Sequence, residues 1–128
     1  MTFLRSVLLH ARWSWLVLFL GMAGIIAVAT LTPQDRVPQG PAGLDKVFHA
    51  LAFGVLVLPV ALLRPDRLPA VLLLAIAYGG LIELIQPLVG RSAERADLFA
   101  DALGALAGAG LGLALRRHLL RRESDRSR

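Results

Sequence analysis

The chain has 128 residues, 56% of which are hydrophobic, and its mean hydropathy is +0.65. A soluble domain of this size is usually about 45–50% apolar, so the composition points away from that class. The lack of cysteine excludes disulfides and thiolate metal sites. The net charge of +5 lies mostly in the tail from Arg116 to Arg128. In a chain with long apolar runs such a surplus sets membrane orientation, so we expect no nucleic-acid partner.

The first apolar run, residues 13–31, contains no charge. A helix needs about 20 apolar residues to cross a bilayer, so this run is long enough to span one. Trp13 and Trp15 mark its start, as interfacial anchors do. A cleaved signal peptide is the rival interpretation, because the run follows basic residues and ends near an A-x-A pattern. The run is longer than an ordinary signal-peptide core, which favours the span.

Three more apolar runs follow a loop at residues 32–44 that holds three prolines and two glycines. Backbone groups in lipid must be satisfied within the segment, and the runs do not alternate as barrel strands do. The sequence therefore predicts an all-α integral membrane four-helix bundle. The predicted division is an N-terminal flank at 1–12, a membrane domain at 13–115 with spans at about 13–31, 47–63, 68–89 and 97–115, and a basic tail at 116–128. We expect the last six residues to be disordered.

The distribution of basic residues predicts the orientation. With four spans, both termini lie on one side, and that side carries ten of the 14 Lys and Arg residues. The other side carries the remaining four, which are Arg36, Lys46, Arg91 and Arg95. By the positive-inside rule we expect both termini in the cytoplasm of a bacterial cell, with the loops near 32–46 and 90–96 facing outward.

Polar residues interrupt the spans near this predicted outer face. Ionisable groups inside apolar spans are costly, so His49, Glu83 and Asp101 require an explanation. At about 1.5 Å per residue, His49 lies about 6 Å below Asp45, and Asp101 lies about 6 Å below Asp97. Glu83 lies roughly 8–10 Å below the outer end of its span by the same rise. The sequence thus predicts that three helices bring these groups into one layer.

A stripe of small residues runs along the fourth span. At about 100° per residue, Asp97, Asp101, Gly104, Gly108 and Gly112 lie on one helix face. The glycines form overlapping G-x-x-x-G units, which allow close approach of membrane helices. We expect this face to point into the bundle and to carry both carboxylates inward. The alternative is a contact face for a homo-oligomer or for another membrane protein.

The polar layer permits three interpretations. The first is structural, with side chains that hydrogen-bond across helices. In a catalytic site, His49 and Glu83 would be the acid and base. The third interpretation is a recognition pocket for a lipid head group or lipid-linked precursor. In either the catalytic site or the recognition pocket, Arg91 and Arg95 would bind phosphate. The spacing is not that of the zinc motif H-E-x-x-H, so we predict no metal site. The sequence identifies no cofactor. It contains no complete set of nucleophile, base and orienting residue, so whether the protein is an enzyme stays open.

The ordered motifs resemble the VanZ-like family. The matching stretches are DKVFHALAF (Asp45 to Phe53), GGLIELIQPLVGRSAERAD (Gly79 to Asp97) and ADALGALAG (Ala100 to Gly108). The resemblance implies a small multi-helix bacterial membrane protein, and the founding member is linked to low-level teicoplanin resistance. The motif positions that carry over are Asp45, Lys46, His49, Glu83, Gln86, Arg91, Asp97 and Gly104. Where the family often has Asn, this chain has Asp101.

From these residues we expect an envelope protein that binds or modifies a lipid-linked or cell-surface component, with an effect on glycopeptide susceptibility. His49 and Glu83 are the predicted catalytic residues. The expected binding residues are Asp45, Lys46, Gln86, Arg91, Asp97 and Asp101. Two alternatives stay open: a non-catalytic interaction subunit that packs through the glycine stripe, and a small transporter that uses buried carboxylates.

Overall fold

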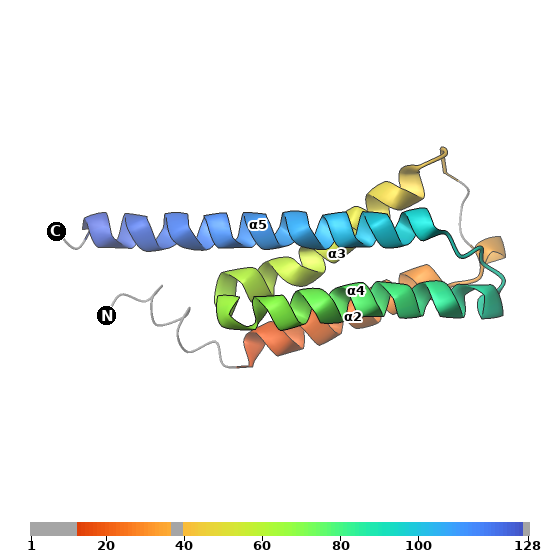
Figure 1. The fold of residues 1–128 in the computed structure, drawn as a ribbon, viewed down its shortest axis with the longest axis horizontal. Coiled ribbons are helices and arrows are strands. Elements are labelled where there is room, and N and C mark those ends of the chain that lie inside the picture. The colour runs from red at the N-terminus through yellow and green to blue at the C-terminus, as the bar shows by residue number, and fades with distance from the viewer. Residues whose placement is uncertain (1–12, 37–39, 127–128) are drawn as a thin grey trace.

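A computed structural model describes residues 13–36 and 40–126, and the predicted flank at 1–12 lies outside this part of the chain. Four α-helices dominate the described residues, and no strand occurs among them (Figure 1). The elements in chain order are α2 (Ser14–Leu31), η1 (Gln34–Arg36), α3 (Leu44–Leu63), η2 (Pro65–Arg67), α4 (Leu68–Ile85), η3 (Gln86–Val89) and α5 (Arg95–Arg126). The predicted all-α four-helix fold is confirmed.

The closest helix pair is α3 with α5, and glycines make this approach possible. A Cβ added at Gly104 would lie 2.0 Å from the carbonyl oxygen of Ala50. A Cβ at Gly108 would lie 2.1 Å from the carbonyl oxygen of Gly54, and one at Gly112 would lie 2.6 Å from the Cβ of Ala61. Since any side chain would occupy the space of the facing backbone, the glycine stripe is covered by α3 in the described chain.

The helix α2 is the most peripheral of the four. Only Phe19 and Ile26 are buried on it, whereas α3 and α4 each bury six residues. Tyr78 of α4 ties it to the bundle by donating a hydrogen bond from its hydroxyl to the carbonyl oxygen of Ala23. The ring of Tyr78 also packs against Phe53 of α3, with 6.2 Å between ring centroids.

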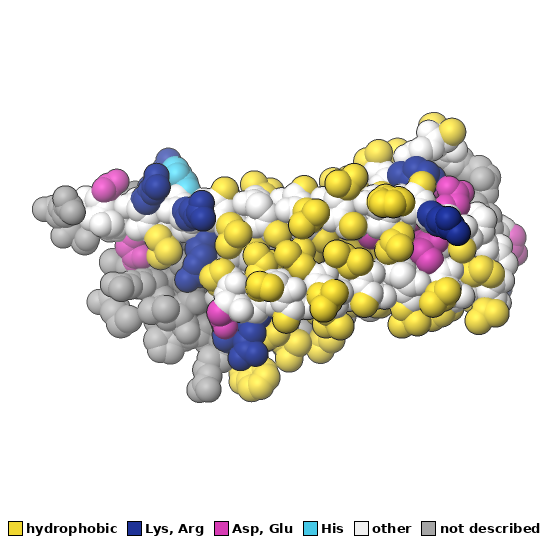
Figure 2. Space-filling view, in the orientation of Figure 1, with side chains coloured by type: hydrophobic (Ala, Val, Ile, Leu, Met, Phe, Trp, Pro, Cys, Tyr) yellow, Lys and Arg dark blue, Asp and Glu magenta, His cyan; other side chains and the backbone are white. Residues whose placement is uncertain are grey.

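The lateral surface of the bundle is apolar. Side chains such as Leu73, Leu84 and Leu88 are 72%, 76% and 83% exposed. Figure 2 shows hydrophobic side chains along the middle of the molecule and charged side chains towards the two ends. Four helices are long and apolar enough to cross a membrane. A surface of this kind is stable in lipid, and the chain is a multi-pass membrane protein.

Both ends of the described chain lie at one end of the bundle (Figure 1). The first turn of α2 and the last turns of α5 lie there, whereas α3 and α5 begin at the other end, where η3 also lies. Helix α5 continues to Arg126, so the expected disorder from Glu123 onward is wrong for residues 123–126. Arg, Leu and Glu are good helix formers, which lets the helix extend beyond its apolar part.

Candidate functional site

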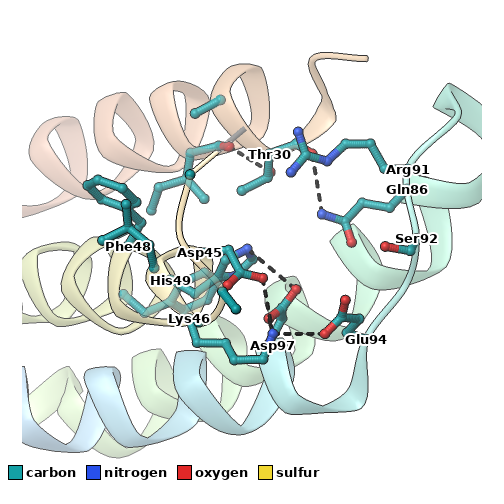
Figure 3. Close-up of a pocket in the computed structure, with 18 of the residues that line it drawn as sticks. Thr30, Asp45, Lys46, Phe48, His49, Gln86, Arg91, Ser92, Glu94 and Asp97 are labelled. Carbon is teal, nitrogen blue, oxygen red and sulfur yellow. Dashed lines mark hydrogen bonds and ion pairs between the residues drawn. The ribbon is translucent and has the colours of Figure 1, made fainter. Parts of the chain in front are cut away.

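A cleft of about 700 Å³ lies between α2 and α3 at the end where α3 begins. Apolar side chains of both helices form its walls, and these are Met22, Ile25, Ile26, Ala29, Phe48, Ala52 and Phe53. Ile25 and Phe48 are 63% and 61% exposed, so the cleft opens on the lipid-facing surface. Its other end is polar, and Figure 3 shows Arg91 and Gln86 on one side and Lys46, His49 and Asp97 on the other.

His49 and Asp101 form a buried pair at the cleft. The Nδ1 atom of His49 lies 2.8 Å from Oδ1 of Asp101, which has no exposed surface. This contact orients the imidazole and, with Asp101 ionised, places the proton on Nδ1. The Nε2 atom lies 3.9 Å from Oδ2 of Asp97, beyond hydrogen-bond distance. The ring is therefore held by a hydrogen bond at Nδ1, while Nε2 lies near Asp97 without hydrogen-bonding to it.

The backbone of α4 makes room for Asp101. A Cβ added at Gly79 would lie 2.7 Å from Oδ2 of Asp101, whereas one at Gly80 would meet nothing within 4 Å. The carboxylate thus packs on bare backbone at Gly79. Its Oδ2 atom has no hydrogen-bond partner among the described residues.

Lys46 connects three carboxylates beside this pair. Its Nζ atom lies 3.0 Å from Asp45, 2.8 Å from Glu94 and 3.4 Å from Asp97. The side chains of Asp45 and Glu94 are each 46% exposed, whereas that of Asp97 is 8% exposed. The carboxylate oxygens approach within 4.8 Å of one another, a spacing that could hold a cation. The lysine ammonium already lies among them, and the geometry gives no reason to replace it with a metal.

Glu83 faces the start of α5 and does not line the cleft. Its Oε2 atom accepts a hydrogen bond of 2.8 Å from the backbone N–H of Glu94. A carboxylate at this position satisfies a free donor and lies at the positive end of the helix dipole. The contact joins α4 to α5, so it fits a structural role. Acid–base chemistry at Glu83 stays a prediction.

Gln86 and Arg91 hold the end of α2. Gln86 Nε2 donates to the carbonyl oxygen of Thr30 at 3.3 Å, and Arg91 Nη1 donates to that of Thr32 at 3.0 Å. Both carbonyls lack helical partners because α2 ends there. Gly90, with φ of +75°, makes the turn that places Arg91 at the cleft, since this conformation favours glycine. Gln86 and Arg91 thus form one polar wall of the cleft and also fix the end of α2.

Every predicted catalytic and binding residue lies at this end of the bundle, but the residues divide into groups. Lys46 contacts Asp97, and His49 contacts Asp101 with Asp97 3.9 Å from its other nitrogen. Gln86 and Arg91 instead contact α2. The sequence reasoning missed the apolar wall residues and three polar side chains of the cleft, which are Thr30, Ser92 and Glu94. Glu94 lies within the quoted motif, three residues before Asp97, so its position before a helix start was the available signal. Thr30 and Ser92 carried no such signal.

A comparison with protein-family models decides the affiliation. The model described as VanZ/LLP1 matches residues 2–116, nearly the whole chain. The chain belongs to this family. The VanZ-like resemblance of the motifs is thereby confirmed, and the family match includes every residue that lines the cleft. No curated protein and no solved structure matches the chain.

Proposed function

We propose that this VanZ/LLP1-family protein binds a lipid or lipid-linked component of the bacterial envelope in the cleft between α2 and α3. The supporting observation is that one cleft joins apolar walls to a polar end. An acyl or prenyl chain fits the walls at Met22, Phe48 and Ala52, and a head group fits the end at His49 and Arg91. A soluble substrate would have no use for the apolar walls.

The proposed orientation places this polar end on the outer face of the cytoplasmic membrane. The opposite end carries the arginine-rich part of α5 and the turn at residues 64–67 (Figure 1), and Figure 2 shows Lys and Arg side chains gathered at that end. By the positive-inside rule that end is cytoplasmic, and so are both termini. The cleft would then meet lipids and lipid-linked wall precursors of the outer leaflet. An effect on glycopeptide susceptibility would follow from altered availability of the drug's target.

The His49–Asp101 pair supports a proton-transfer role in this function. A histidine oriented through one nitrogen by a buried carboxylate is a suitable general base or acid at its other nitrogen. Ser92 lines the cleft but has no contact that would activate it as a nucleophile among the described residues. The proposal is therefore binding with acid–base assistance, and the transport and interaction alternatives stay predictions.

A lipid profile of whole cells tests the proposal. Mass spectrometry would compare a deletion strain with strains restored by wild type, by His49→Gln or by Arg67→Gln at equal protein abundance. Arg67→Gln is the control, because Arg67 is exposed at the opposite end of the bundle. We expect one lipid or lipid-linked species to accumulate on deletion, to return to normal with wild type and Arg67→Gln, and to stay high with His49→Gln. Four identical profiles would contradict the proposal.

A further inference from the structure

The two sides of the polar end differ in charge. One side bears the carboxylates of Asp45, Glu94 and Asp97, with the single ammonium of Lys46 among them. Three carboxylates and one ammonium leave this side with a formal charge of minus two. The other side bears the guanidinium of Arg91 and the amide of Gln86 (Figure 3). A ligand that lies between them meets a negative surface and a positive surface at once.

The side that bears the three carboxylates, here called the acidic side, can bind a second ammonium group. Lys46 shows the geometry, because its Nζ atom contacts three carboxylates at 2.8–3.4 Å. One lysine cannot neutralise all three, and Asp45 and Glu94 remain 46% exposed on their side chains. An incoming primary ammonium would therefore find accessible acceptors with uncompensated charge.

Gln86 gives an independent indication of a ligand. The residue is 1% exposed and lines the cleft, and its Oε1 atom has no hydrogen-bond partner among the described residues. Its Nε2 atom is committed to Thr30, which leaves Oε1 as an acceptor for something else. A buried carbonyl oxygen without a donor is unfavourable, so a ligand with an N–H or O–H group would relieve it.

Arg91 supplies the complementary site for an anion. A guanidinium has five N–H donors, and the described residues provide one partner, the carbonyl oxygen of Thr32. The remaining donors suit the oxygens of a phosphodiester, which an arginine can bind through two parallel hydrogen bonds. Arg91 lines the cleft, so the phosphate would lie where the apolar walls end.

We propose that the cleft recognises a zwitterionic phospholipid whose head group carries a phosphate and a primary ammonium, as phosphoethanolamine does. The phosphate pairs with Arg91. The ammonium lies between the two sides and uses its three N–H groups for Asp45, Glu94 and Gln86 Oε1. This inference rests on the proposed function, since it names the lipid class of the same cleft. A choline head group lacks the N–H donors, and a glycerol head group lacks the positive charge.

Native mass spectrometry of the purified full chain tests this choice. The protein in detergent receives an equimolar mixture of phosphatidylethanolamine, phosphatidylcholine and phosphatidylglycerol with identical acyl chains. We expect the ethanolamine lipid to be bound about tenfold more than either other lipid, the effect of about one charge-assisted hydrogen bond. Equal binding, or preference for one of the other two, overturns the head-group proposal. Displacement of bound lipid by soluble phosphoethanolamine at a similar concentration would reassign the site to water-soluble phosphate esters.

Two further variants separate this proposal from the proposed function. Asp45→Asn removes an exposed carboxylate of the acidic side, and we expect the preference for the ethanolamine lipid over the glycerol lipid to fall about tenfold. Asp66→Asn is the matched control at the opposite end, and it should keep the preference. An unchanged preference in Asp45→Asn contradicts the proposed ammonium site.

Ala52→Trp fills the apolar part of the cleft, so lipid binding should drop whatever the head group. Unchanged binding in Ala52→Trp would refute the cleft as a lipid site altogether.

Discussion

His49 shows how one side chain at the polar end depends on its neighbours. Its Nδ1 atom is held at 2.8 Å by Asp101, and Asp101 in turn lies against the bare backbone of Gly79. The orientation of the imidazole therefore depends on Gly79 of α4, which acts through Asp101 of α5. A residue without any ionisable group thus contributes to the geometry of the candidate site.

This dependence gives a prediction at the residue scale. Gly79→Ala would bring a Cβ to 2.7 Å from Asp101 Oδ2, which must move away from a fully buried position. We expect the free energy of unfolding to fall by about 1–3 kcal/mol, as overpacking usually costs. Denaturation in mixed micelles, followed by circular dichroism, measures the change.

Gly80→Ala is the matched control, because its Cβ would meet nothing within 4 Å. The same substitution there should leave stability unchanged or raise it by up to about 1 kcal/mol, since alanine favours the helix. Equal effects of the two substitutions would show that Asp101 is not confined by Gly79.

Among the helices, α3 and α5 form the closest pair. The glycine stripe of α5 lies on the backbone of α3, and both helices supply polar residues to the site from this contact. His49 lies one residue before Ala50, whose carbonyl oxygen faces Gly104. The close approach thus sets the distance between His49 and Asp101.

Gly108→Ala should consequently separate the two helices. Its Cβ would lie 2.1 Å from the carbonyl oxygen of Gly54, and backbone cannot move aside as a side chain can. We expect a loss of about 3 kcal/mol or more in the free energy of unfolding of the monomer. The measurement is the denaturation midpoint in a detergent that keeps the protein monomeric.

Gly110→Ala provides the control on the same helix, since nothing lies within 4 Å of its added Cβ. It should retain the wild-type midpoint. If Gly108→Ala also retained it while losing a dimer or a partner, the stripe would serve association between chains, as the interaction alternative requires.

The whole molecule has an apolar lateral surface between two polar ends, and the ends have different compositions. One end brings carboxylates, His49, Lys46 and Arg91 together at a cleft, and the other is rich in arginine. By the positive-inside rule this asymmetry predicts the orientation proposed above, with the arginine-rich end in the cytoplasm. In the proposed function this orientation determines which leaflet would supply the lipid.

Cysteine labelling tests the direction, and the natural chain contains no cysteine to interfere. We expect Ser92→Cys, at the polar end of the cleft, to react with a membrane-impermeant maleimide in intact cells. Arg67→Cys, in the turn at the opposite end, should react only after the cells are opened. The reverse pattern would place the cleft at the cytoplasmic face and would contradict the proposed access to outer-leaflet lipids.

The sequence alone determined the fold class, the number of spans and the layer in which the polar residues lie. Each of these depends on properties local to one segment: the length of an apolar run, the rise per residue and the face of a helix. The ordered motifs were also sufficient to indicate the family, which the family model confirms. The prediction that His49 and Asp101 lie in one layer followed from the distance of each residue below the outer end of its helix.

Only the tertiary structure decided which of these residues touch. The rotation and crossing of helices bring Asp101 to His49 and Glu94 to Lys46, and they direct Glu83 to the start of α5. The cleft has the same origin, because it exists where α2 packs loosely beside α3. No single span encodes such a space, since its walls come from α2 and α3 and its polar end comes from α3, η3, the connection at 90–94 and α5.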